Sequence, residues 1–312
     1  MSIDIRDAFF DELSSLAASD PDLLLLTDDQ GAFGLNRFRR ERPSQFLNAG
    51  IAEQNLISVA AGLALSGKRP FVYGIATFMS MRCYEQIRVD LGCMQLPVTI
   101  VASGPGYSYG SDGPTHHANQ DIAILRVLPG LSLYNPSDAV LTVACARLAY
   151  ATSGPAYIRL ERGVLPELHR PDDDFSAGFL VLAPVGEVVL VATGVMVARA
   201  RTVAEQLGRH GVQASVIDVF RLAPIAAAEL VAALGPARAV IALEDSARTG
   251  GLGSAVLEIL ADAGRSCAVM RIAAPDSYLY EYGDRDWLHA RVGLDEVAST
   301  AAILAWLERT LA

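Results

Sequence analysis

The sequence is nearly devoid of lysine: Lys68 is its only one, and it falls in the polar turn 66–70. Schiff-base and pyridoxal enzymes need a lysine that is desolvated in a pocket, because the amine must lose its proton before it attacks. A lysine in a turn does not meet this condition. The sequence therefore argues against that class of enzyme.

Other common signatures are also missing. The net charge is −10 and no basic tract occurs, which argues against a nucleic-acid partner. The four cysteines show no Cys-x-x-Cys spacing, so we expect reduced thiols and a cytoplasmic protein. No apolar run of membrane-spanning length is free of charge and proline, and the N-terminus shows no secretory core, so we expect no membrane association.

Nucleotide-binding glycine motifs are absent as well. Neither Gly194 nor the cluster 250–253 forms Gly-x-Gly-x-x-Gly after a predicted strand, and no Walker pattern occurs. We interpret these glycines as turn and helix-packing residues. What the chain has in abundance is apolar residues, 52% of 312, which is enough for a large core and for extensive subunit contacts.

Short apolar runs alternate with helical patterns along the whole chain. The runs are continuously hydrophobic, which is typical of parallel strands covered on both faces. A segment rich in proline and aspartate, 166–185, separates two such series and is predicted to be a linker. The sequence thus predicts two consecutive α/β domains, 1–165 and 186–312. We also expect a polar loop at 33–43, and Ser137 as the cap of a helix that ends near 151.

Glu53 stands out because it lies between a short apolar run, 46–47, and a helix, 55–65, that is apolar almost all round. Such a helix is predicted to be buried. A carboxylate is tolerated at its first turn, where free N–H groups and the helix dipole favour negative charge. The simpler interpretation is a glutamate that only satisfies the helix end.

Two further segments follow predicted strands, where parallel sheets place ligands. Phe78, Met81 and Tyr84 recur at three-residue spacing and predict a flat apolar wall, although a plain core stripe has the same pattern. The long loop 103–119 contains Asp112 and His116, and a long loop kept in a compact domain is usually functional. Its spacing does not suit a metal, so we predict no metal ligands in this chain.

Four motifs occur in a fixed order: Asn-Ala-Gly-Ile-Ala-Glu-Gln-Asn at 48–55, the Thr-Phe…Tyr-Glu-Gln-Ile-Arg helix at 77–88, Asp-Gly-Pro-Thr-His at 112–116, and Gly-Pro-Ala-Tyr-Ile-Arg-Leu-Glu-Arg at 154–162. Together they resemble the pyrimidine-binding domain of transketolases and of 1-deoxyxylulose-5-phosphate synthase. The second series, with Val-Ala-Thr-Gly, Ala-Leu-Glu-Asp and Gly-Gly-Leu-Gly, is similar to the C-terminal domain of the same enzymes.

The resemblance implies a thiamine diphosphate-binding fold followed by a transketolase C-terminal-type domain. Glu53 matches the glutamate that hydrogen-bonds the pyrimidine nitrogen N1′ and takes part in catalysis. Phe78 matches the aromatic residue that stacks on the pyrimidine, and Tyr84 the tyrosine near its amino group. Met81 stands where many transketolases carry another aromatic residue, and Asp29 matches an aspartate near the cofactor at the subunit interface.

For the substrate, the resemblance implies contacts from Asp112 and His116 to sugar hydroxyls, with His116 acting in catalysis. Arg162 matches a phosphate-binding arginine, and Arg159 is expected to assist it, because guanidinium groups suit phosphate. Gly104 departs from the pattern, since many transketolases have a substrate-binding histidine there. This departure bears on the substrate: the sequence does not determine which sugar is used or whether that sugar is phosphorylated.

In this family the diphosphate is held through Mg²⁺ (or Ca²⁺) by Gly-Asp-Gly and a later asparagine. The only Gly-Asp here is at 283–284, followed by Arg285 and outside a strand–helix junction. We therefore expect the metal to be bound by a partner, an N-terminal diphosphate-binding transketolase subunit. Active sites across a two-fold axis would make the assembly an α2β2 heterotetramer.

The sequence thus predicts the C-terminal (β) subunit of a split transketolase, which transfers a two-carbon ketol unit between a ketose and an aldose. Two alternatives within the enzyme class remain: a synthase of the deoxyxylulose-phosphate type, and a 2-oxo acid decarboxylating β subunit. A third is a regulatory homologue that kept the fold and lost catalysis.

Overall fold

The computed structural model describes residues 3–311, which form two compact units. Of the described residues, 3–105 and 124–171 form the first unit. The second unit is formed by 106–123 and 172–311. The long loop that the sequence places after a strand of the first series therefore folds with the second unit.

The first unit is built on a parallel sheet with strand order β5-β6-β4-β3-β1-β2. Its strands are β1 (Leu23–Thr27), β2 (Phe46–Asn48), β3 (Arg69–Ile75), β4 (Thr99–Ser103), β5 (Ser132–Tyr134) and β6 (Ala156–Leu160). The central strands β1, β3, β4 and β6 are buried almost throughout. This burial on both faces explains why they are continuous apolar runs in the sequence.

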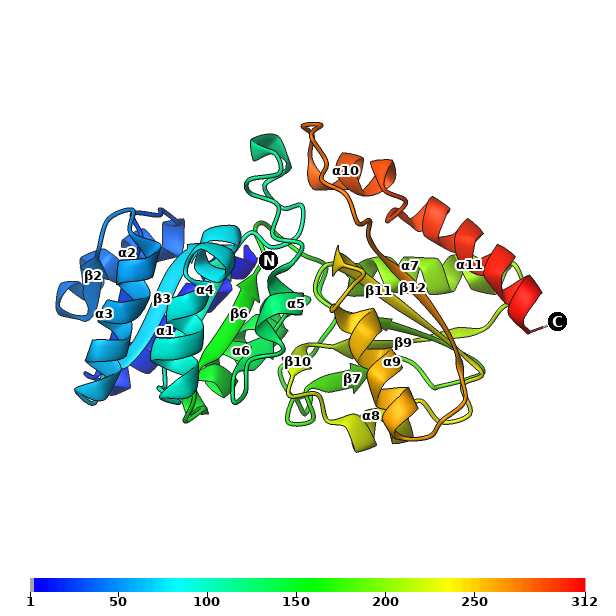
Figure 1. Cartoon of the computed structure of the whole chain (residues 1–312), viewed down its shortest axis with the longest axis horizontal. Helices are drawn as coiled ribbons and strands as arrows, with labels where there is room; N and C mark the ends of the chain where they lie inside the picture. Colours follow the sequence, from blue (N-terminus) through cyan, green and yellow to red (C-terminus); the bar gives the residue numbers. More distant parts are fainter. Residues whose placement is uncertain (1–2, 312) are drawn as a thin grey trace. The chain divides into compact units, whose positions relative to one another are not determined.

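Helices cover both faces of this sheet. They are α1 (Ile5–Ser19), α2 (Phe33–Glu41), α3 (Glu53–Leu65), α4 (Tyr84–Gln86) and α6 (Ala139–Ala151), with a 3₁₀ turn at Pro43–Gln45. The short helix α5 (Asp121–Leu125) contains the point at 123–124 where the chain passes from the second unit back to the first. Helix α1 packs with α2 and α6, whereas α3 packs with the helical segment that follows β3 (Figure 1). Because right-handed crossovers alternate in direction along the sheet, the two groups of helices fall on opposite faces.

The helix α2 corrects the expectation of a loop at 33–43. Gly34, Leu35 and Phe38 of this helix are buried, and α2 packs on α1. The Gly34 N–H donates to Asp7 Oδ1 at 3.1 Å, and a Cβ at Gly34 would lie 2.7 Å from Phe10 Cβ. Packing on α1 therefore stabilises a helix that the charged local sequence does not predict.

The segment after β3 is helical, as predicted, but much of it is wound as π-helix. Residues Phe78–Arg82 and Ile87–Cys93 form π turns on either side of α4. The Cys83 thiol donates to the Phe78 carbonyl at 3.3 Å, five residues back. Single π turns re-aim side chains and are frequent at functional sites.

The second unit contains a five-stranded sheet of order β12-β11-β8-β9-β7, in which β7 alone is antiparallel to its neighbour. The strands of this part of the chain are β7 (Phe179–Val181), β8 (Val188–Ala192), β9 (Ala214–Val219), β10 (Arg221–Ala223), β11 (Ala239–Ala247) and β12 (Ala268–Ala274). Strand β7 lies within the segment expected to be a linker. The predicted domain boundaries, 1–165 and 186–312, stay a prediction.

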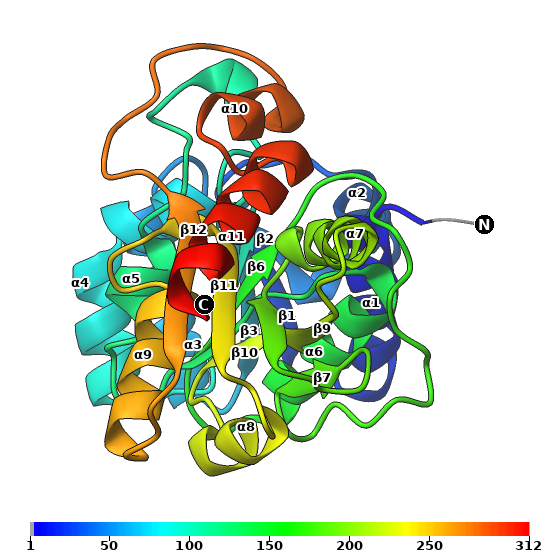
Figure 2. The same cartoon turned by 90° about the vertical axis from the view of Figure 1, so that its right-hand side faces the viewer.

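The helices of the second unit are α7 (Met196–Arg209), α8 (Ala227–Ala233), α9 (Leu252–Asp262), α10 (Arg285–Arg291) and α11 (Glu296–Thr310). Helices α7 and α11 pack together, as do α8 and α9, and α7 and α9 lie on opposite sides of the sheet (Figure 2). Within residues 3–311, the apolar helices are too short or too polar to cross a bilayer.

Helix α6 is capped by Asp138 and not, as expected, by Ser137. Asp138 is fully buried, and its Oδ1 accepts the Leu141 N–H at 2.7 Å. Its Oδ2 accepts the backbone N–H groups of Leu168 and His169 at 2.7 and 2.8 Å, and it lies 3.1 Å from His169 Nδ1. Burial alone raises the pKa of Asp138, but the hydrogen bonds outweigh it, so the pKa lies below its usual value. One carboxylate thus ties a helix start to the end of the first unit.

Asp138→Ala should lower the free energy of unfolding by roughly 2–4 kcal/mol, because it removes a helix cap and leaves buried N–H groups without their acceptor. Asp295→Ala is the control, since Asp295 caps α11 through Val297 and Ala298 at a more exposed helix start. That change should cost about 1 kcal/mol. Urea unfolding of both variants is the measurement, and equal losses would show that the contacts to 168–169 add nothing.

Candidate active site

Glu53 is the first residue of α3 and is 3% exposed. The turn before it is set by Asn48 and by Gly50, which has φ +73°; Asn48 Oδ1 accepts the Gly50 N–H at 3.0 Å. The N-cap residue, Ala52, offers no side chain to the free N–H groups of the first turn. A carboxylate at this point is therefore favoured by the helix end even though it is buried.

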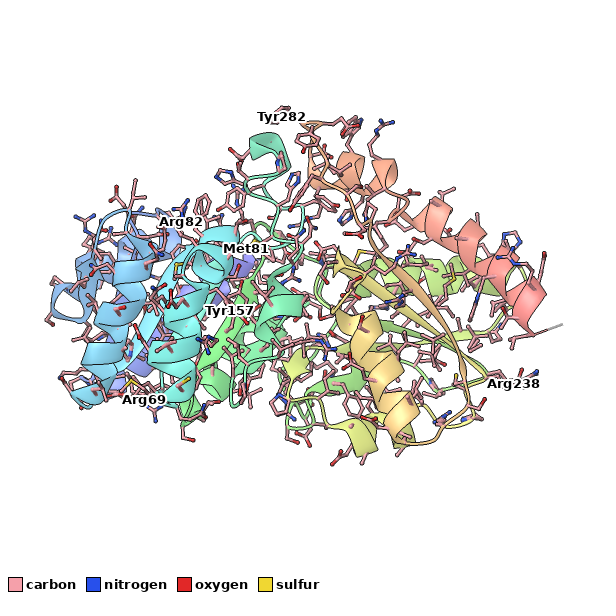
Figure 3. The ribbon with its side chains drawn as sticks, viewed as in Figure 1. Arg69, Met81, Arg82, Tyr157, Arg238 and Tyr282 are labelled. Atoms are coloured by element: carbon pink, nitrogen blue, oxygen red, sulfur yellow. The ribbon has the colours of Figure 1, made fainter. Side chains whose placement is uncertain are left out.

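The carboxylate of Glu53 is paired with Arg82, the residue labelled in Figure 3. Arg82 Nη1 donates to Glu53 Oε1 at 2.7 Å, and its Cζ lies 4.1 Å from the centre of the Phe78 ring. A planar, delocalised N–H donor thus lies on an aromatic ring while it donates to a buried carboxylate. The guanidinium thus occupies the position between the Glu53 carboxylate and the face of the Phe78 ring, called the slot below, and a flat nitrogen heterocycle has a shape that suits this position.

A second carboxyl group, Asp28, belongs to the same cluster and was not singled out from the sequence. It directly follows β1 and is 5% exposed. A Cβ at Gly74 would lie 2.5 Å from Asp28 Oδ2, so the glycine in β3 makes room for this carboxyl. Burial, and then the charge of Glu53, raise the pKa of Asp28 to about 7. The same two causes raise the pKa of the Cys83 thiol to about 12.

The other residues expected around the pyrimidine lie in the same unit. Met81 precedes Arg82 and is half-buried (Figure 3). The Tyr84 hydroxyl donates to the Ile124 carbonyl at 2.9 Å. Asp29 is exposed, has φ +72° and accepts the Asn48 side-chain amide at 2.8 Å. The position after β1 is the signal that could have identified Asp28 beside Asp29.

The two arginines expected at a phosphate differ in exposure. Arg162 follows β6 and is exposed, whereas Arg159, within β6, is fully buried. A phosphate in solution can therefore reach Arg162 directly. The assisting role of Arg159 stays a prediction, and it would require a ligand that reaches into the unit.

The loop with the remaining expected residues is closed at its base and held by the second unit. Gly106 and Ala118 exchange two backbone hydrogen bonds, of 3.1 and 3.0 Å. The Asn119 side-chain amide donates to the Asp245 carbonyl at 3.0 Å, and the Asn119 carbonyl accepts the Ala247 N–H at 2.7 Å. A Cβ at Gly106, which has φ +58°, would lie 1.9 Å from Asp245 Oδ2. Only glycine fits this close approach of the loop to the end of β11.

Within the loop, two side chains point into the fold and two expected site residues remain accessible. His117 is buried with its ring 5.0 Å from that of Tyr107, and burial lowers its pKa. Asp112 is exposed and accepts from its neighbour, Ser111. His116 is half-buried, with Nδ1 3.0 Å from the Thr115 hydroxyl. The atypical His117 and Tyr107 thus hold the loop, whereas Asp112 and His116 can meet a ligand.

The cluster that holds this loop continues to α10. The Tyr107 ring lies 5.8 Å from that of His289, whose Nε2 is 4.0 Å from Asp245 Oδ2. His289 also contacts Arg199, and burial is the main cause that lowers its pKa to about 4. His289 is therefore neutral near pH 7 and packs as an uncharged residue. In the part of the chain that the structure describes, no three His, Cys, Asp or Glu side chains gather as metal ligands.

Both halves of the chain match known protein families. Residues 1–167 match the family described as the pyrimidine binding domain of transketolase. Residues 179–298 match the family described as the transketolase C-terminal domain. The expectation of these two α/β folds in this order is confirmed.

Individual relatives agree with this result. An apulose-4-phosphate transketolase subunit from Phocaeicola vulgatus is 34% identical over 307 residues, which cover 97% of this chain and 97% of that protein. The 1-deoxy-D-xylulose-5-phosphate synthase of Syntrophotalea carbinolica is 33% identical over 305 residues, but the match covers only 47% of the synthase. A solved structure described as a split gene transketolase, inactive beta4 tetramer, has a TM-score of 0.88 and 34% identity, and the match covers 99% of this chain and 100% of that one.

Asp28→Asn should remove a pH dependence of stability. Because the folded pKa of Asp28 is raised from 3.8 to about 7, the folded chain keeps a proton that the unfolded chain loses. The contribution of the protonated Asp28 to the free energy of unfolding is full below pH 4 and is lost as the pH rises through 7. At pH 8 the variant should be more stable than the parent chain by about 2–4 kcal/mol, with little difference at pH 4.

Urea unfolding at a series of pH values measures this difference. Asp29→Asn, at the exposed neighbouring carboxylate, is the control and should keep the parent's pH dependence. An unchanged pH slope in Asp28→Asn would contradict the raised pKa.

Proposed function

The chain belongs to the transketolase family, and we propose that it is the C-terminal (β) subunit of a thiamine diphosphate-dependent enzyme that transfers a two-carbon ketol unit from a ketose to an aldose. A relative that is itself named as one subunit of a transketolase matches it over nearly the full length of both chains. This full-length match supports a transketolase whose two kinds of subunit are separate polypeptides.

The observation that supports the cofactor best is the slot between Glu53 and the Phe78 ring. In this slot the guanidinium of Arg82 serves as a stand-in for a flat heterocycle, since it stacks at 4.1 Å and donates an N–H to the carboxylate at 2.7 Å. An aminopyrimidine offers the same face and a ring nitrogen at its edge. The donor set of the first unit therefore fits the pyrimidine half of thiamine diphosphate.

When bound, thiamine diphosphate supplies a nucleophilic carbon and an electron sink for cleaving the bond next to a ketone. In our proposal, Glu53 hydrogen-bonds the pyrimidine nitrogen N1′ and exchanges a proton with it. Phe78 fixes the plane of the ring, with Met81 and Tyr84 beside it. The buried start of α3 keeps the carboxyl in one position, and this preorganisation is what the chain contributes.

For the substrate, we assign the accessible loop residues Asp112 and His116 to sugar hydroxyls and the exposed Arg162 to a terminal phosphate. A carboxylate and an imidazole suit hydroxyl groups as hydrogen-bond partners, and a guanidinium suits phosphate. The loop is held at its base by Asp245 and Asn119, so its accessible side chains are presented on a fixed support.

The diphosphate and its Mg²⁺ are assigned to a partner subunit. The present chain has no Gly-Asp-Gly motif. The similar solved structure is described as a split gene transketolase, inactive beta4 tetramer, and this description supports our assignment of a second kind of subunit to the present chain. We propose an α2β2 assembly for the active enzyme.

A synthase of the deoxyxylulose-phosphate type is the second candidate, because a synthase matches at 33% identity. The chain spans about half of that synthase, 47% of its length. The two reactions differ in the donor: a synthase decarboxylates pyruvate, whereas a transketolase cleaves a ketose. A screen of ketose phosphates against pyruvate, with the diphosphate-binding subunit present, separates them.

Glu53→Gln should reduce ketol transfer by the reconstituted complex by at least about 100-fold, because the amide cannot exchange a proton with the cofactor. Glu85→Gln, at an exposed glutamate of α4, is the matched control and should retain activity. Steady-state turnover of a ketose phosphate is the measurement. Full turnover in Glu53→Gln would remove Glu53 from catalysis, and turnover by the isolated chain would show that no partner is needed.

Arg162→Ala should raise KM for a phosphorylated substrate by about one to two orders of magnitude, because it removes a charge-assisted contact. The matched unphosphorylated sugar should show little change. The ratio of kcat/KM for the two substrates, in the parent and the variant complex, is the measurement. An equal effect on both sugars would contradict phosphate binding by Arg162.

A further inference from the structure

We propose that Arg82 competes with the cofactor for the slot: its guanidinium uses the Glu53 oxygen and the Phe78 ring face that the pyrimidine requires, and it must swing out before the pyrimidine binds. This inference rests on the proposed function, in which Glu53 and Phe78 hold the pyrimidine. It adds that the chain's own side chain sets part of the cofactor affinity.

The two uses exclude each other at the carboxyl oxygen and the ring face that Arg82 occupies. Arg82 Nη1 lies 2.7 Å from Glu53 Oε1, and Cζ lies 4.1 Å from the Phe78 ring centre. A second flat group cannot occupy that ring face and reach the same carboxyl oxygen at hydrogen-bond distance while the guanidinium remains. The guanidinium resembles the pyrimidine in flatness and delocalisation, and both present a nitrogen to the carboxyl group, which is why the guanidinium fits the slot.

The two partners differ in their freedom to move. The Glu53 side chain is 3% exposed and begins a buried helix, whereas the Arg82 side chain is 45% exposed. Arginine has a long flexible stem, so its head can leave for water at small cost. When a ligand enters the slot, Arg82 is therefore the group that moves.

The same contact stabilises the folded chain. Glu53 lies in a cluster with Asp28, whose pKa is raised by burial and then by the Glu53 charge, and with the buried thiol of Cys83. Arg82 is the cation paired with this acidic cluster. Removal of its charge should thus destabilise the chain and, at the same time, free the slot. These opposite effects distinguish a competitor from an ordinary cofactor ligand.

The test compares Arg82→Gln with Arg88→Gln, at an exposed arginine of the same helical segment. Thiamine diphosphate with Mg²⁺ is titrated calorimetrically into the complex with the diphosphate-binding subunit. Arg82→Gln should bind about 5- to 30-fold more tightly, because one partly exposed charge-assisted contact no longer has to be broken. Arg88→Gln should bind like the parent.

Thermal unfolding of the chain by itself gives the second readout. Arg82→Gln should unfold at a lower temperature than both the parent and Arg88→Gln. Arg82→Lys, which keeps the charge but not the flat head, guards against a poorly folded variant and should show intermediate tightening. Unchanged or weaker binding in both Arg82 variants would overturn the inference.

Two variants of the slot itself distinguish this failure from a failure of the proposed function. Phe78→Ala and Glu53→Gln, each introduced into the Arg82→Gln chain so that no competitor occupies the slot, should both weaken thiamine diphosphate binding relative to Arg82→Gln if the slot holds the pyrimidine. If neither does, the slot assignment is wrong and the competition is wrong with it. If both weaken binding while the Arg82 variants do not tighten it, only the competition is wrong.

Discussion

The burial of one carboxylate, that of Glu53, is the constraint on which the first unit's site depends. An unpaired charge in an apolar interior is costly, so the chain supplies three compensations: the N-terminus of α3, the guanidinium of Arg82, and the raised pKa of the neighbouring Asp28. Each compensation comes from a different element of the fold. The buried carboxylate of Glu53 is therefore tolerated only because β1, α3 and the segment after β3 meet at the carboxyl edge of a parallel sheet.

Local irregularities serve this arrangement. The π turn Phe78–Arg82 places the guanidinium over the ring four residues before it. Gly74 has no side chain, and this leaves beside β3 the space that the Asp28 carboxyl fills. The π turn interrupts a regular helix beside the charged cluster, whereas Gly74 keeps β3 regular and only removes a side chain there.

The second unit makes a different contribution, a firm support for a long polar loop. Asp245 and Asn119 hold the base of the loop on β11, and the neutral His289 fills the space beside Tyr107. Because the inward-facing side chains of the loop are used for packing, Asp112 and His116 are left accessible. The support explains how a glycine-rich loop can present side chains in a reproducible place.

The sequence by itself determined the alternating α/β pattern, the parallel sheets, the position of Glu53 at the start of a buried helix, and the family. These features follow from the spacing of apolar residues along the chain and from short contiguous motifs, and both can be read directly from the sequence. Only the tertiary structure decided that 33–43 is a helix on α1, that Asp28 and Arg82 join Glu53, and that the loop around Asp112 folds with the second unit. These features depend on contacts between residues far apart in the chain, and the pattern of neighbouring residues does not reveal such contacts.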